Sequence, residues 1–209
     1  MSVAPQVPSA VTPGQTLGWR LGETVHRSPL RRRARAVGIG DASGLLALAV
    51  ARGCRHYSGL VPENPLGDPG TVAISDEELV ALLLLNANAF EPVLIRAAAE
   101  LLRRRPIDVQ KLARAARRER CERALAYIAQ AGQVHDRTGA AWWAALLAAL
   151  GPQRAIAPGV LPHWSRFAAL HGFNRKGKSL GARWIGAAAR TIRRSSSPPL
   201  IGIWCARRG

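Results

Sequence analysis

The sequence predicts an all-α protein, in which a largely irregular segment precedes a small bundle of about four helices and a basic helical region follows it. Leu and Ala dominate an apolar content of 48%, and both residues favour helices. Strand-forming residues are sparse, with only 2 Tyr and 3 Phe in 209 residues. Apolar residues recur at helical spacing from about residue 75 to residue 150. We therefore divide the chain into 1–72, 73–151 and 152–209.

Proline and glycine punctuate residues 1–72. The prolines of this segment are Pro5, Pro8, Pro13, Pro29, Pro62, Pro65 and Pro69. Because both residue types interrupt regular elements, only a short helix near 45–51 is expected here. We expect the rest to be irregular or disordered, so that limited proteolysis leaves a resistant core beginning near Val72.

The helical bundle is predicted for residues 73–151. Ser75 with Glu78 three residues later forms a capping box, which predicts a helix to about residue 85. Helix-starting and helix-ending residues predict three more helices, over 92–105, 108–132 and 138–150. Short connections between them favour antiparallel neighbours.

The net charge of +17 favours an acidic partner, such as nucleic acid, an anionic membrane surface or an acidic protein. Of the 30 basic residues 27 are Arg, a bias that the codon usage of a GC-rich bacterial genome also produces. The distribution of charge is more specific, because residues 152–209 hold 11 basic residues and no acid. Asp136 is the last acidic residue of the chain. We therefore expect the C-terminal region to carry the binding function.

The three cysteines, Cys54, Cys121 and Cys205, are far apart in the sequence. They form neither a disulfide framework nor the closely spaced pairs of a zinc site, so we expect a protein of the reducing cytoplasm without a metal or other cofactor. No stretch reaches the roughly 18 apolar residues of a membrane span.

A basic loop at residues 172–179 matches the pattern Gly-x4-Gly-Lys-Ser. It resembles the phosphate-binding loop of P-loop nucleotide hydrolases, which implies that Lys178 meets phosphates and Ser179 holds magnesium. The family also needs a buried strand before the loop and a later Asp, and this chain has no acid after Asp136. We therefore expect the loop to bind phosphate groups at the start of a helix without hydrolysing a nucleotide.

The predicted helix from Ser179 to about residue 194 has a basic face, because Arg183, Arg190 and Arg194 are spaced by seven and four residues. The preceding loop adds further cations to this face. The complete candidate site for nucleic acid or another anion is Arg175, Lys176, Lys178, Ser179, Arg183, Arg190 and Arg194. A basic helix beside tryptophans is typical of a nucleic-acid-binding surface, although Trp in a helix is more often a core residue.

Arg166 and His171 resemble the Arg-x4-His motif of HEPN-type ribonucleases. The resemblance implies a catalytic pair on a long helix, whereas Gly172 interrupts the helix here. No Ser-His-Asp or Cys-His arrangement is indicated elsewhere.

We expect a non-catalytic bacterial protein whose basic C-terminal region contacts RNA or DNA phosphates. One alternative is a protein–protein adaptor that binds an acidic partner. The other is a nuclease or nucleotide hydrolase that uses one of the two short motifs.

Overall fold

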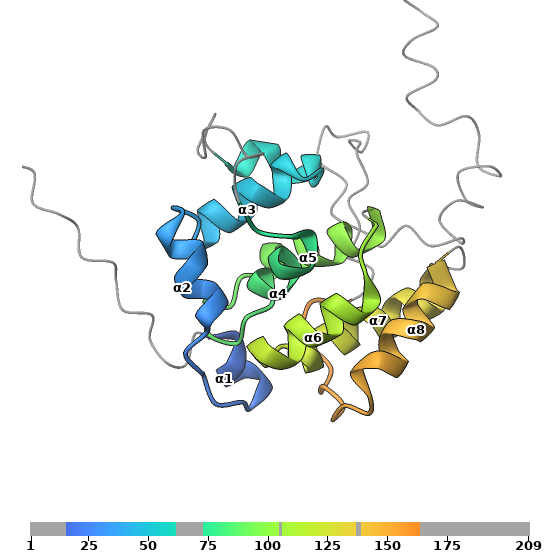
Figure 1. Cartoon of the computed structure of the whole chain (residues 1–209). Helices are drawn as coiled ribbons and strands as arrows, with labels where there is room; N and C mark the ends of the chain where they lie inside the picture. The colour runs from blue at the N-terminus through green and yellow to red at the C-terminus, as the bar shows by residue number, and fades with distance from the viewer. Residues whose placement is uncertain (1–15, 62–72, 105, 137–138, 164–209) are drawn as a thin grey trace, which may run out of the picture.

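A computed structural model describes residues 16–61, 73–104, 106–136 and 139–163 of the chain (Figure 1). The part that it describes is helical and contains no strand, so the all-α class is confirmed. The elements are α1 (Leu17–Leu21), α2 (Pro29–Ala36), α3 (Ala42–Ala51), the 3-10 helix η2 (Arg55–Leu60), α4 (Asp76–Leu83), α5 (Pro92–Arg104), α6 (Val109–Glu119), α7 (Glu122–His135) and α8 (Ala140–Leu150). None of these helices is long and apolar enough to cross a bilayer.

Helix α4 lies at the centre of the arrangement, between α2 and α3 on one side and α6 on the other (Figure 1). Every residue from Leu79 to Asn88 is buried. The buried apolar side chains form one cluster that runs from Leu17 through α4 to Leu161. The core therefore crosses the boundary that the sequence suggested at residue 72.

Residues 16–61 form α1, α2, α3 and η2, so the prediction of an irregular segment over 1–72 is wrong for them, except that the short helix expected near 45–51 is present within α3. Pro29 occupies the first turn of α2 behind the N-cap Ser28, where a missing amide hydrogen costs nothing. Asp41 caps α3 in the same way. Pro29 therefore starts a helix, although prolines in this segment predict an interruption of regular structure.

Helix α1 is only five residues long, so it depends on contacts with the rest of the fold. The amide of Leu17 donates to the carbonyl of Asn88 at 2.9 Å, and that of Gly18 donates to Asn86 at 2.8 Å. These bonds attach the N-terminal helices to the segment that follows α4.

The predicted capping box of Ser75 and Glu78 is present at the start of α4, and Asp108 caps α6 as expected. The helix predicted over 108–132 is instead two helices, because Arg120 adopts a left-handed conformation with φ 53°. The amide of Cys121 then donates to the carbonyl of Ala116 at 3.0 Å, which is the bond of a Schellman turn. Glycine usually marks such a turn, and its absence concealed the break.

Residues 152–160 have no regular structure but are held against the folded part by hydrogen bonds. Arg20 donates to the carbonyls of Gly159 and Val160, both at 3.1 Å. Arg123 donates to the carbonyl of Ala155 at 2.8 Å.

Candidate nucleic-acid interface

The site predicted from the sequence lies outside the described residues. This applies to Arg175, Lys176, Lys178, Ser179, Arg183, Arg190 and Arg194, and also to Arg166 and His171. The predicted helix from Ser179 to about residue 194 falls entirely in the same region. The candidate interface is therefore built here from the cationic side chains that the structure describes.

Most acidic residues of the described part of the chain are buried or partly buried. Only Asp41 and Asp108 are exposed, and both cap helices. The Asp41 carboxylate accepts the amide of Gly44 at 2.7 Å, and Asp108 accepts that of Lys111 at 2.9 Å. Backbone hydrogen bonds therefore engage the two exposed carboxylates of this part of the chain.

The basic side chains of the described residues are mostly exposed. The exposed ones are Arg27, Arg32, Arg33, Arg35, Lys111, Arg114, Arg117, Arg118, Arg120 and Arg154. Ten exposed cations thus stand against two exposed acids, and most of the cations lie on α2 and α6 or directly beside them. The accessible surface is more basic than the composition of these residues alone indicates.

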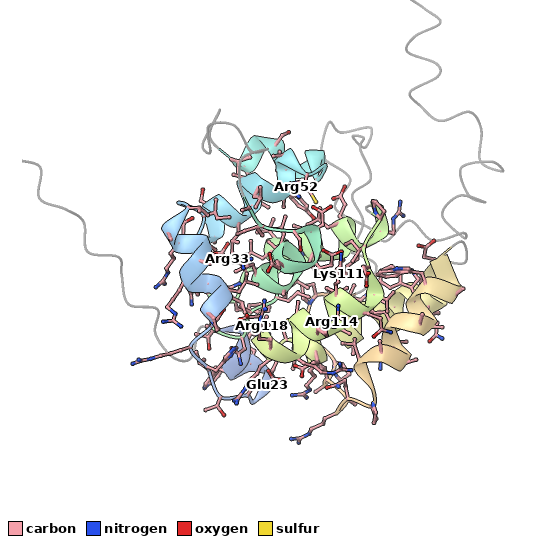
Figure 2. All side chains as sticks on the ribbon, in the orientation of Figure 1. Glu23, Arg33, Arg52, Lys111, Arg114 and Arg118 are labelled. Atoms are coloured by element: carbon pink, nitrogen blue, oxygen red, sulfur yellow. The ribbon has the colours of Figure 1, made fainter. Side chains whose placement is uncertain are left out.

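Helix α6 presents a row of cations because of its apolar spacing. Leu112 and Ala116 are buried, which leaves Lys111, Arg114 and Arg118 on the solvent side at intervals of three and four residues. Figure 2 shows these three side chains along α6, on the same face of the molecule as Arg33 of α2.

A groove of about 500 Å³ separates this row from the start of α4. Its polar lining comes from Ser75, Glu77, Glu78, Lys111, Arg114 and Arg118. We call it the α4–α6 groove.

Glu78 connects three elements at the edge of the α4–α6 groove. Its carboxylate accepts the amide of Ser75 at 3.1 Å and forms an ion pair with Arg33 of α2. The Nη2 of Arg118 lies 3.7 Å from its other oxygen. Burial alone would raise the pKa of Glu78, but the hydrogen bonds from Arg33 and Ser75 and the charges of Arg33 and Arg118 lower it overall.

Glu119 occupies a different place from the one the sequence suggested. Its position directly after Arg117 and Arg118 suggests a solvent-exposed partner for the basic face of α6, but its side chain is fully buried. Its Oε2 accepts the Ser28 hydroxyl at 2.5 Å, and its Oε1 accepts the Nε of Arg118 at 3.0 Å. The sequence held a sign of this, since Glu119 follows the buried Ala116 by three residues.

The same carboxylate faces a histidine. His26 Nε2 lies 3.9 Å from Glu119 Oε2, and its Nδ1 lies 3.3 Å from Oδ1 of Asn86. This cluster joins the segment before α2 to α6 and to the turn after α4. It lies inside the protein, where it links elements of the fold.

Nothing in the described part of the chain resembles a catalytic centre. Its His, Cys, Asp and Glu side chains form no group of three that could hold a metal ion. Cys121 is buried, and burial raises the pKa of its thiol, which disfavours the thiolate needed for nucleophilic attack. A second cavity of about 430 Å³ is lined by Trp142, Trp143 and other apolar residues, together with the charged residues Arg103, Asp108 and Asp136.

Comparison with known proteins gives no relative: no family model, no curated protein and no solved structure matches this chain.

Proposed function

We propose that this protein is a non-catalytic nucleic-acid-binding protein whose C-terminal region contacts phosphates. The observation that carries the proposal is the separation of charge along the chain and across its surface. The last 73 positions contain no Asp or Glu, and the described acids are largely buried, capping or paired. A surface with many cations and few accessible carboxylates attracts a polyanion, because few carboxylates of the protein compete with it for the cations.

The contacts are assigned to the loop at 172–178 and to the basic face that follows it. Arg183, Arg190 and Arg194 supply guanidinium groups, which bind phosphate oxygens through paired N–H donors. Sequence preference is expected to be modest, since contacts to phosphates position a protein without reading bases. RNA and DNA offer the same phosphates, so both are candidate ligands.

Salt dependence of binding tests the proposal. Each neutralised phosphate releases counterions, so about five contacts give a loss of roughly two to three decades in affinity between 50 and 200 mM salt. The double variant Arg183→Ala, Arg190→Ala should reduce the slope of log affinity against log salt. The control is Arg32→Ala, Arg35→Ala, which removes the same charge from two exposed positions of α2, outside the C-terminal region and the α4–α6 groove.

A protein–protein adaptor would behave differently. A pull-down from the native cells, with and without nuclease, separates the two functions. One stoichiometric protein that is recovered equally after nuclease treatment, together with no salt-dependent binding of RNA or DNA by the purified chain, would refute the proposal.

A further inference from the structure

The α4–α6 groove has the charge and shape of a second binding surface, separate from the C-terminal region. Lys111 and Arg114 are exposed, and both interact with the capping carboxylate of Asp108, which already accepts the amide of Lys111. Glu77, on the opposite wall, is already engaged, since its Oε1 accepts the amide of Asp108 at 3.1 Å. Backbone amides engage both neighbouring carboxylates, so the two cations of the groove remain accessible to an external anion.

The cations form a line along α6. Lys111 and Arg118 are seven residues apart on one helix, which corresponds to about 10 Å along the helix axis. That length covers roughly three successive phosphates of one strand, at about 3.4 Å of axial rise each. A row of this kind suits a continuous phosphate backbone better than it suits a single small anion.

The guanidinium of Arg118 is positioned to bind such a ligand. Its Nε donates to the buried Glu119 at 3.0 Å, which fixes the guanidinium while its side chain remains 52% exposed. The outer Nη2 meets Glu78 only at 3.7 Å, a distance too long for a hydrogen bond. The outer edge of the Arg118 guanidinium therefore forms only a loose ion pair with Glu78. Such a pair contributes little to stability in solvent.

We propose that the α4–α6 groove binds the phosphates of a nucleic-acid strand through Lys111, Arg114 and Arg118, and that Glu78 competes with those phosphates for Arg33 and Arg118. This rests on the proposed function, to which it adds a site on the folded part of the chain. The carboxylate of Glu78 occupies the position of a phosphate between two arginines. Ligand phosphates replace it as the partner of the arginines, and the bond from the Glu78 amide to the Ser75 hydroxyl at 3.2 Å keeps the helix capped.

The charge of Glu78 can be removed without removing its capping role, because Gln also completes a capping box. Glu78→Gln should therefore raise affinity for a fluorescein-labelled mixed-sequence oligonucleotide by roughly three- to tenfold at low salt, with a steeper salt slope, because guanidinium groups become available to phosphates. The matched control is Glu77→Gln, which removes the same charge from the same groove but releases no arginine. An equal gain in both variants would show a general effect of net charge and overturn the assignment of Glu78.

The loss experiment is Lys111→Ala, Arg114→Ala in the full chain. Two lost contacts reduce the salt slope by roughly 1.4–1.8, and each accounts for about a threefold change in affinity between 50 and 200 mM salt. The control is Arg32→Ala, Arg35→Ala on α2, which removes the same charge outside the groove. Thermal melting of all four variants checks that each is folded.

The outcomes separate the two proposals. If wild-type protein shows no salt-dependent binding of RNA or DNA, the proposed function and the groove assignment both fail. If wild-type protein binds, but the groove variant loses no more than the α2 variant, the groove assignment fails and the C-terminal proposal stands. A larger loss in the groove variant, with a gain specific to Glu78→Gln, supports the assignment.

Discussion

The contact between α7 and α8 depends on the absence of a side chain at Gly132. A Cβ atom added there would lie 2.9 Å from Cε3 of Trp143 and still closer to Cδ2 and Cε2. Trp143 is 1% exposed, stacks edge-on against Trp142 with ring centroids 4.7 Å apart, and donates from Nε1 to Asp136. Burial, the contact with Trp142 and the hydrogen bond to Asp136 therefore restrain the position of the ring.

Gly132→Ala places two effects of opposite sign in competition. Helix propensity alone predicts a gain of about 1 kcal/mol, because Gly lies in the interior of α7. Carbon atoms pack at about 3.5–4.0 Å, so the buried ring must shift by more than half an ångström. Such overpacking costs about 1–3 kcal/mol, and we expect the upper part of this range because the displaced group is a whole indole. The net result is a destabilisation of about 1–2 kcal/mol.

Thermal and urea unfolding measure this change, with an expected fall in Tm of roughly 2–8 °C for a chain of this size. Gln133→Gly and Gln133→Ala give the propensity difference at an exposed neighbour in the same helix, without a packing contribution. In the background of Trp143→Phe, the cost of Gly132→Ala should shrink, because the smaller ring leaves room for the methyl group. A Gly132→Ala variant as stable as the wild type would refute this account of the α7–α8 contact.

Four further predictions follow from particular contacts. Arg120→Gly should stabilise the protein by about 0.5–1 kcal/mol in urea unfolding, because the left-handed conformation costs an L-residue more than it costs glycine. If α6 and α7 were one continuous helix, the same substitution would instead destabilise the protein by about 1 kcal/mol. Ser28→Ala should cost about 2–4 kcal/mol, since it removes both an N-cap and the hydroxyl bond to the buried Glu119, and Ser28→Thr should cost less. Limited proteolysis should leave a resistant fragment that retains Trp19, and mass spectrometry showing a core beginning at residue 72 would contradict the packing of α1 to α3. The purified protein should not hydrolyse ATP or GTP, and magnesium-dependent turnover abolished by Lys178→Ala would overturn the non-catalytic proposal.

Much of the fold was predictable wherever local signals and long-range contacts agree. The capping box at Ser75 and the N-cap Asp108 are encoded by residues three positions apart, so both helix starts were found. The break at Arg120 was missed because its left-handed conformation lacks the usual glycine. Gly132 predicts the end of a helix, but it lies within α7 and allows the close approach of α8. The sequence does not reveal this contact.

The candidate interface was predictable in charge and only partly in place. Helical spacing from Leu112 and Ala116 is enough to place Lys111, Arg114 and Arg118 outside the core of the bundle. It did not indicate that Glu78 on α4 lies between Arg33 and Arg118, since the three residues come from three helices. Nor was Glu119 assigned to the interior, because a carboxylate is buried only where partners from elsewhere in the fold satisfy it.

By itself, the sequence determined the helical class, the capped starts of α4 and α6 and the absence of acids after Asp136, since each depends on composition or on residues a few positions apart. Tertiary structure alone decided that residues 16–61 join the core, because α1 is too short to be stable without its bonds to the turn after α4. It also decided which charges face solvent. Glu119 is buried against Ser28, and Glu78 pairs with Arg33. In both pairs the partners are distant in the chain, and only the packing of the helices brings them within a few ångströms.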